Sequence, residues 1–229
     1  MPRIFISGAS KGIGLATARR FVAAGYEVAI SASTEASLQA VQASDPKIQT
    51  FRADMSVKAE VQALGEWINT HFGPLDVLVN NVGKFLPGEI HKETDEAFES
   101  TMHTNLFSNY YLTKAVLPAM MERKQGDIFN ICSTASIMAY PNGGSYCISK
   151  FALLGFSKVL REEMKAYNLR VISVIPGATL TASWDGVDLP ESRFMPPEDI
   201  ATAIFETHQL SPRTVVEEIL LRPALGDLD

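Results

Sequence analysis

The sequence has 229 residues, a formal net charge of −6, 46% hydrophobic residues and 20% charged residues. This composition is typical of a globular protein with a large core, and the acidic balance argues against a nucleic-acid binder, which needs a clustered basic face. No apolar run approaches the ~18 residues of a membrane span, and the first ten residues do not resemble a signal peptide. The only cysteines are Cys132 and Cys147, so we expect no disulfide framework and predict a cytoplasmic protein.

Short β-branched runs alternate with helical patterns along the whole chain. Strands are predicted at residues 3–7, 27–31, 48–51, 76–80, 127–132, 170–175 and 217–221. Helices are predicted at residues 12–24, 35–43, 56–72, 94–123, 145–167 and 197–208. Most of the strands are apolar almost throughout, which is typical of strands buried on both faces. The alternation predicts an α/β fold with a doubly wound, seven-stranded parallel sheet and helices on both faces, a Rossmann-like three-layer arrangement.

Residues 181–197 are the one segment without clear periodicity. They contain Pro, Gly, Trp184, Phe194 and Met195. Loops of this length are usually functional lids or disordered segments, and the aromatic residues favour a lid over a substrate site. Because no repeat, low-complexity tract or linker interrupts the chain, we predict a single domain spanning residues 1–229.

A glycine-rich stretch, SGASKGIGLA at residues 7–16, follows the first predicted strand and opens the first predicted helix. Glycine at positions 8, 12 and 14 permits a tight turn and close approach of a ligand to the backbone. The helix N-terminus behind the turn offers free N–H groups and a positive dipole end to a pyrophosphate. Many glycine-rich turns bind nothing, but the position between strand and helix predicts a dinucleotide site.

Tyr146 and Lys150 are four residues apart in a predicted helix, so their side chains share one face. A free tyrosine has a pKa of ~10, and lowering it by ~3 units requires ~4 kcal/mol of preference for the phenolate. A positive charge ~4 Å away supplies roughly that amount at an effective dielectric constant of ~20. Such pairs also recur by chance, so the pair alone does not identify an enzyme.

Five motifs occur in the order found in the short-chain dehydrogenase/reductase family. The glycine loop, with Ser7 in the threonine position, resembles that family's T-G-x-x-x-G-x-G, and NNVG at residues 80–83 resembles its N-N-A-G. Asn105 stands where the family carries a catalytic asparagine. Ser133, Tyr146 and Lys150 match the family's Ser and Y-x-x-x-K, and PGATLT at residues 176–181 matches its P-G-x-x-x-T. The resemblance covers nearly the whole chain.

The resemblance implies roles for these residues. Tyr146 would protonate a carbonyl oxygen, Ser133 would hydrogen-bond the same oxygen, and Lys150 would keep Tyr146 acidic and hold the ribose. Asn105 would anchor a water that links Lys150 to solvent. The implied cofactor site consists of Ser7, Gly8, Ser10, Lys11, Gly12, Ile13, Gly14, Ser33, Asp54, Met55, Asn81, Gly83, Tyr146, Lys150, Pro176, Gly177, Thr179 and Thr181. Within it, Asp54 would bond the adenine and Thr181 the carboxamide.

The choice between NADP and NAD depends on charge near the ribose 2′ position. NAD-selective sites place a carboxylate after the second strand, but by resemblance that position is Ala32, followed by Ser33 and Thr34. Lys11 resembles the basic residue that many NADP-dependent members carry in the glycine loop. Glu35 could instead reach the ribose hydroxyl. We predict NADP(H), with NAD(H) as the less favoured alternative.

These observations predict an NADP-dependent carbonyl reductase that acts on a small ketone, such as a 3-oxoacyl or pterin-like compound. The alternative is a catalytically weak NADP-sensing protein on the same fold. The four histidines are scattered, so no metal site is predicted. The resemblance also implies a homodimer or homotetramer, and we expect neither a nucleic-acid nor a membrane partner. The pattern gives no role to either cysteine; small packed apolar residues are the simpler interpretation.

Overall fold

The computed structural model describes residues 1–184 and 186–227. One parallel sheet has the strand order β3-β2-β1-β4-β5-β6-β7. The strands are β1 (Arg3–Ile6), β2 (Glu27–Ala32), β3 (Ile48–Arg52), β4 (Val77–Asn80), β5 (Gly126–Ile131), β6 (Leu169–Pro176) and β7 (Glu218–Leu221). The predicted fold class is confirmed. Both ends of every predicted strand lie no more than two residues from the ends of the observed strand.

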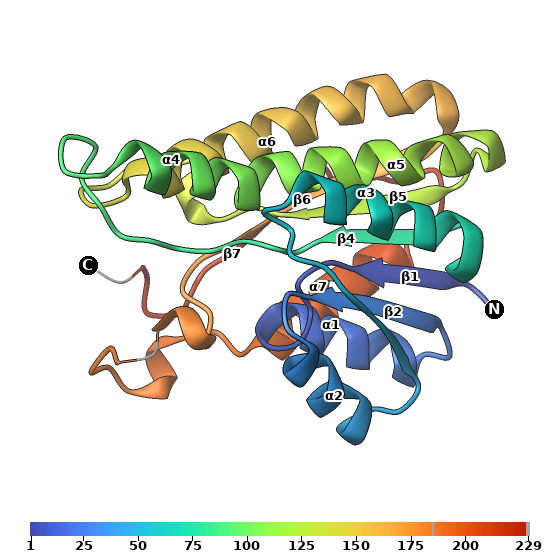
Figure 1. The fold of residues 1–229 in the computed structure, drawn as a ribbon, viewed down its shortest axis with the longest axis horizontal. Coiled ribbons are helices and arrows are strands. Elements are labelled where there is room, and N and C mark those ends of the chain that lie inside the picture. Colours follow the sequence, from blue (N-terminus) through green and yellow to red (C-terminus); the bar gives the residue numbers. More distant parts are fainter. Residues whose placement is uncertain (185, 228–229) are drawn as a thin grey trace.

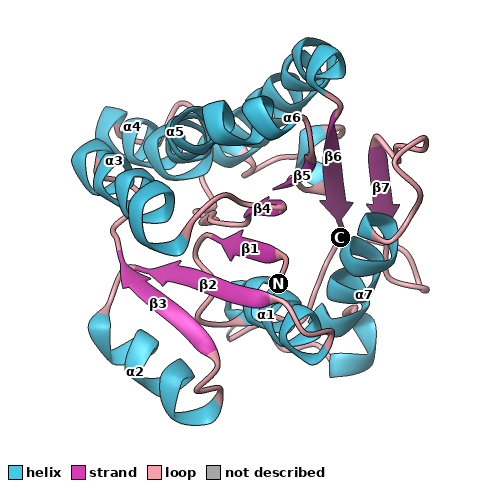
Figure 2. Ribbon diagram, turned by 90° about the vertical axis from the view of Figure 1, so that its right-hand side faces the viewer, coloured by secondary structure: helices cyan, strands magenta, loops and turns pink. Residues whose placement is uncertain are grey.

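Helices cover both faces of the sheet, as Figures 1 and 2 show. One face carries α1 (Gly12–Ala23), α2 (Glu35–Ser44) and α7 (Pro197–His208). The other carries α3 (Lys58–Trp67), α4 (Asp95–Met102), α5 (Ser108–Arg123) and α6 (Gly144–Met164). No helix of the described residues is long and apolar enough to cross a bilayer.

Two large buried clusters, one on each face, hold these layers together. In β1, Ile4 and Ile6 belong to the cluster that includes Ile200 and Ile204 of α7, whereas Phe5 belongs to the cluster under α3 and α5. Successive side chains of a strand point to opposite faces, so a parallel strand with a helix layer on each side is apolar at every position.

The helix ends follow local chemistry. Thr34 and Thr94 each accept a hydrogen bond from an N–H group in the first turn of α2 and α4, and Gly25, at φ +85°, follows the end of α1. The single helix predicted over 94–123 is interrupted, since a π-helical turn at His103–Phe107 separates α4 from α5. Such turns are rare and often mark functional sites, and this one contains Asn105.

The strand order reverses direction between β1 and β4. In open parallel sheets, the carboxyl ends of the strands at such a switch point form a crevice that binds ligands. The glycine-rich stretch follows β1 and NNVG begins at the end of β4. The topology therefore brings the predicted cofactor motifs to one edge of the sheet.

Candidate active site

The glycine loop has the backbone shape that its sequence predicts. Gly8 and Gly12 have φ angles of +60° and +57°, a region that favours glycine. Lys11 occupies the N-cap position of α1 and is exposed, and no side chain caps the helix. The first N–H groups of α1 therefore remain available to a pyrophosphate.

Hydrogen bonds join the glycine loop to the loop after β4. The buried Ser7 hydroxyl accepts bonds from the N–H groups of Asn81 (3.1 Å) and Val82 (3.2 Å). The Asn81 side chain donates to the carbonyls of Ser7 and Gly8, both at 2.9 Å. A Cβ at Gly14 would lie 2.6 Å from Asn81 Nδ2, so only glycine fits there. Ser7, Gly14 and Asn81 thus shape the cradle, while Ser10 is half-buried in the loop and Ile13 packs on the core.

The end of β2 has no carboxylate on Ala32 or Ser33, as expected, but it has a basic neighbour that the sequence analysis missed. Arg52 pairs in register with Ala32, and its Nε donates to the Ser33 carbonyl at 3.2 Å. Its other arm contacts Glu60 at 2.7 Å. Arg52 is the last residue of β3, two before Asp54, so strand pairing rather than sequence proximity brings it to Ser33.

Asp54 and Met55 follow β3. The Asp54 carboxylate accepts bonds from the Ser56 hydroxyl (2.7 Å) and N–H (2.9 Å), and these bonds lower its pKa. The carboxylate is therefore a negatively charged acceptor, and its bond to the adenine stays a prediction. The Met55 side chain is 5% exposed and packs in the core, so only its backbone can face a ligand.

The segment after β6 returns to the glycine loop. A Cβ at Gly12 would lie 3.1 Å from the methyl of Thr181, which places Thr181 beside the loop. Thr179 is buried, and its hydroxyl donates to the Gly177 carbonyl at 3.0 Å. Gly177 and Pro176 pack against the C-terminal segment, since the Gly177 N–H donates to the Leu221 carbonyl at 2.8 Å. Of this motif, Thr181 is the residue that the structure brings nearest to the glycine loop.

Tyr146 lies in the first turn of α6, half-buried beneath the Phe85 ring, whose centroid is 4.9 Å away in an edge-to-face arrangement. Burial raises the pKa of Tyr146, and the Ser133 side chain partly opposes that shift. Ser133 is held by a capping box with Ser136 at the start of a short 3₁₀ turn. The predicted acid and its predicted partner are therefore together.

The predicted effect of Lys150 on the pKa of Tyr146 is wrong. Lys150 Nζ lies 5.9 Å from the centre of the Tyr146 ring and donates to the Ile131 carbonyl at 2.8 Å. Burial lowers the pKa of Lys150 itself to about 8. The pKa of Tyr146 moves up because burial disfavours the charged phenolate, and Lys150 is not among the groups that oppose this shift.

Asn105 is completely buried, and its side chain makes three hydrogen bonds within the protein. Its amide donates to the Lys84 carbonyl (3.0 Å) and the Ser149 hydroxyl (2.9 Å), and its oxygen accepts from the Lys84 N–H (2.8 Å). Its backbone carbonyl accepts from Asn109 at 2.8 Å. The sequence analysis missed Ser149, which also donates to the Tyr146 carbonyl and so links Asn105 to α6. The sequence feature that could have indicated Ser149 is its position as a small polar residue directly before Lys150.

Gly83 completes the group around Lys150, because a Cβ there would lie 3.3 Å from Lys150 Nζ. Cys132 and Cys147 are both buried, and burial raises the pKa of the Cys132 thiol to about 11. A buried thiol with a high pKa is unreactive, which agrees with the packing interpretation of Cys132.

Some residues of the predicted lid, 181–197, make defined contacts within the protein. Thr179 and Met195 form a β-bridge, and the rings of Trp184 and Phe194 lie 5.2 Å apart. Phe194 and Met195 are 9% and 8% exposed, so their side chains belong to the interior. Asp185, within the same predicted segment, lies outside the described residues.

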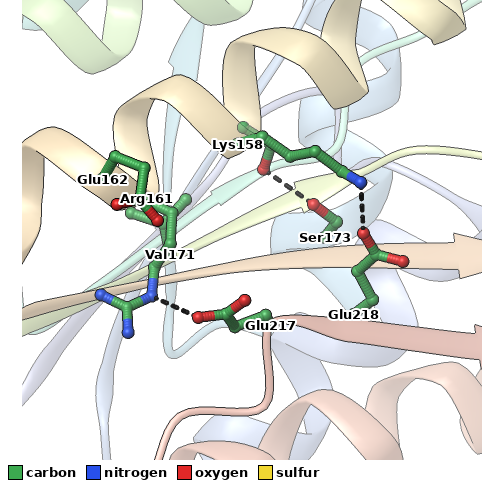
Figure 3. Close-up of a pocket in the computed structure, with 8 residues that line it drawn as sticks. Lys158, Arg161, Glu162, Val171, Ser173, Glu217 and Glu218 are labelled. Atoms are coloured by element: carbon green, nitrogen blue, oxygen red, sulfur yellow. Dashed lines mark hydrogen bonds and ion pairs between the residues drawn. The ribbon is translucent and has the colours of Figure 1, made fainter.

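A separate pocket lies between α6, β6 and β7 (Figure 3). Four of its five charged side chains are paired with one another, Lys158 with Glu218 at 2.9 Å and Arg161 with Glu217 at 3.1 Å. None of the predicted site residues lines it. Elsewhere in the described chain, no group of three His, Cys, Asp or Glu side chains is placed to hold a metal ion.

The fold and the site together define a class. A glycine loop at the switch point of a doubly wound sheet is typical of a dinucleotide-binding protein, and the adjoining loop after β4 reaches Lys150 through Gly83. Residues 2–191 match the family model described as short chain dehydrogenase. The chain belongs to the short-chain dehydrogenase family, and the prediction of an oxidoreductase is confirmed.

Individual relatives give the same result. The chain is 36% identical to the sepiapterin reductase of Chlorobaculum tepidum, over 98% of this chain and 97% of that one. A metagenomic short-chain oxidoreductase solved with NADP is 29% identical, with a TM-score of 0.85 and 97% of each chain covered. An alcohol dehydrogenase of Thermococcus sibiricus, complexed with 5-hydroxy-NADP, is 25% identical, with a TM-score of 0.91 over 100% of this chain and 99% of that one.

Proposed function

We propose that the protein is an NADP(H)-dependent carbonyl reductase acting on a small ketone, with pterin-like and 3-oxoacyl compounds as the substrate classes to test first. The observation that carries the proposal is the grouping of Ser133, Tyr146 and Lys150 beside a glycine loop whose N–H groups are uncapped. The similarity to a sepiapterin reductase supports the pterin class, and the NADP-bound relatives support the cofactor.

The chain's residues fit NADP(H). The cradle around Gly14 has no space for a side chain, and the positive φ angles at Gly8 and Gly12 open the backbone to a pyrophosphate. Ser33 and Arg52, which meet at the end of β2, would hold the 2′-phosphate, and the exposed Lys11 of the glycine loop would supply a second cation. When bound, NADPH supplies the hydride.

Tyr146 acts as the proton donor in this proposal. Its raised pKa keeps the phenol protonated through the neutral range, so the proton is present for transfer. The same shift makes the free protein's phenol a weaker acid, so we propose that bound cofactor and substrate lower this pKa before transfer. Ser133 hydrogen-bonds the same carbonyl oxygen and stabilises the charge that develops on it. Protonated Lys150 would hold the ribose hydroxyls of the cofactor, and Asn105 orders the elements around it through Lys84 and Ser149.

Residues 181–197 form the lid of a single-domain enzyme in this proposal. Support comes from Thr181, which lies against Gly12, and from the contact of Trp184 with Phe194. The homodimer or homotetramer and the cytoplasmic location stay predictions, which light scattering and fractionation would test.

Replacing Tyr146 by Phe tests the proposal. General acid catalysis contributes ~10²–10⁴-fold, so we expect kcat for ketone reduction to fall by about that factor while NADPH affinity is unchanged. NADPH oxidation would be followed with a pterin ketone, a 3-oxoacyl thioester and simple diketones. Full activity of the variant would overturn the acid assignment. A wild-type protein that binds NADPH but reduces none of the ketones would favour the sensor alternative.

A further inference from the structure

The loop between β4 and α4, residues 84–93, is fastened to the candidate catalytic elements at both ends. At its start, the Asn105 side chain holds the backbone of Lys84 by two hydrogen bonds. At its end, Glu93 contacts the first turn of α6, the helix that carries Tyr146 and Lys150. Figure 1 places the beginnings of α4 and α6 at the same end of the molecule.

Glu93 supplies a cap that α6 otherwise lacks. The N-cap residue of α6 is Gly143, which has no side chain to accept a hydrogen bond. The two Glu93 carboxylate oxygens accept from the Ser145 N–H at 3.1 and 3.2 Å, and one of them also accepts from the Ser145 hydroxyl. A carboxylate at a helix N-terminus satisfies free N–H groups and interacts favourably with the helix dipole.

Two glycines make room for this contact. A Cβ at Gly144 would overlap the Glu93 carboxylate, and a Cβ at Gly88 would lie 2.6 Å from Glu93 Cγ. The same part of the loop is bonded to the α6 side by its backbone, because the Gly88 N–H donates to the Asn142 carbonyl at 2.9 Å. The loop therefore sits tightly against the start of α6, with Glu93 between them.

We infer that Glu93 is a positioning residue for the proposed reaction. Ser145 directly precedes Tyr146, so the carboxylate fixes the turn of helix from which the phenol projects. The same carboxylate holds the loop that places Phe85 on the Tyr146 ring. Glu93 thereby sets the distance between the proton donor and one wall of the substrate site. This inference rests on the proposed function for its kinetic consequences but not for the structural contact.

Four variants test it. Glu93→Ala removes the cap, Glu93→Gln keeps its shape and one acceptor oxygen but removes its charge, and Ser145→Ala removes the hydroxyl partner. Glu89→Gln is the matched control, because Glu89 is in the same loop but pairs with His91 and Lys92 instead of α6. Small misplacements of a catalytic group cost up to about 10²-fold, so we expect kcat of Glu93→Ala to fall by roughly 10–100-fold. NADPH affinity should be unchanged, and the solvent deuterium isotope effect on kcat should rise.

Glu93→Gln should recover most of the activity, and Glu89→Gln should match the wild type. Equal kcat for Glu93→Ala and the wild type, or a loss that appears only as weaker NADPH binding, would overturn the inference. Hydrogen–deuterium exchange gives a readout that does not need turnover. Exchange should speed up in residues 84–93 and 144–147 of Glu93→Ala, and unchanged exchange there would refute the contact. A wild-type protein without reductase activity would refute the proposed function while leaving the exchange result to decide on Glu93.

Discussion

Lys150 shows how burial changes the chemistry of a single side chain. It is 4% exposed, its ammonium bonds a backbone carbonyl, and burial brings its pKa down to about 8. The charge that the proposed mechanism needs is therefore present at neutral pH and is lost within the mildly alkaline range. Tyr146 has a pKa shifted in the opposite direction, so it stays protonated over the same interval.

We expect NADPH affinity to weaken as the pH rises through about 8, because neutral Lys150 no longer attracts the cofactor's ribose oxygens. The 2′-phosphate ionises near pH ~6 and is already charged there, so it does not produce this change. Fluorescence titration of NADPH binding across the range measures the effect. An affinity that stays constant up to about pH 9.5 would contradict it.

The same shift has the opposite effect on stability. The unfolded chain keeps the Lys150 proton up to its ordinary pKa of ~10.4 while the folded chain releases it near 8, so this residue's contribution to stability rises with pH between those values. Raising the pH from about 8 to ~10.4 does not destabilise the folded protein through Lys150. Weaker NADPH binding in this range would therefore not come from unfolding caused by Lys150.

Arg52 is the residue that we expect to decide between the cofactors together with Lys11. Hydrogen bonds to charged groups contribute ~1.5–3 kcal/mol, so Arg52→Ala should weaken NADPH binding by roughly 10–100-fold and leave NADH binding nearly unchanged. Arg19→Ala is the control, because Arg19 pairs with Asp45 instead. Equal effects of Arg52→Ala on both cofactors would remove Arg52 from the 2′-phosphate site.

At the scale of whole elements, two glycines within helices differ in how closely their surroundings pack. Gly14 joins α1 to the loop after β4, and a Cβ on it would approach Ala9 Cα to 2.8 Å as well as Asn81. Gly155 in α6 is exposed, and a Cβ on it would have nothing within 4 Å. Helix propensity favours alanine at both positions, but close packing opposes it at Gly14 alone.

Gly14→Ala should therefore destabilise the protein by about 1–3 kcal/mol and weaken NADPH binding, since the cradle must move to accept a methyl group. Gly155→Ala should stabilise it by about 0.5–1 kcal/mol, because alanine loses less backbone entropy in a helix. Urea unfolding of both variants measures the difference. The same sign of change in the two variants would contradict this account of the loop.

Over the whole molecule, the two ends of the sheet have separate tasks. The carboxyl ends of β1 to β6 carry the candidate site residues, whereas the amino ends of β5 and β6 carry a buried ionic network. There the Asp127 carboxylate accepts two hydrogen bonds from the Arg170 guanidinium, at 2.6 and 2.5 Å, and contacts His208 Nδ1 at 2.6 Å. His208 also contacts the Tyr26 hydroxyl at 2.8 Å. The network ties α7 to the sheet and to the turn after α1.

Asp127→Ala should cost about 3–5 kcal/mol, because it leaves the largely buried Arg170 charge without its partner. Asp45→Ala removes an exposed pair and should cost no more than about 1 kcal/mol. NADPH affinity of both variants should equal that of the wild type, since neither residue is near the cofactor loop. Chemical unfolding and cofactor titration test both statements. A cost below about 1 kcal/mol for Asp127→Ala would show that the network is not structural.

The sequence by itself determined the features that depend on local order. Strand–helix alternation, apolar runs and glycine spacing are properties of neighbouring residues, so they predicted the sheet, the cofactor loop and the family. Ser133, Tyr146 and Lys150 were recognised from the spacing of a family motif that spans one turn and one helix, and their catalytic roles stay predictions. Helix ends also followed from nearby threonine and glycine residues.

Only the tertiary structure decided what depends on distant residues and on burial. Arg52 reaches Ser33 through strand pairing, and Glu93 meets Ser145 across 52 positions of sequence. The pKa shifts of Tyr146 and Lys150 depend on how much water the folded chain removes, which no spacing encodes. Contacts between distant segments and the loss of water arise together when the chain packs, and this is why they could not be predicted from the sequence.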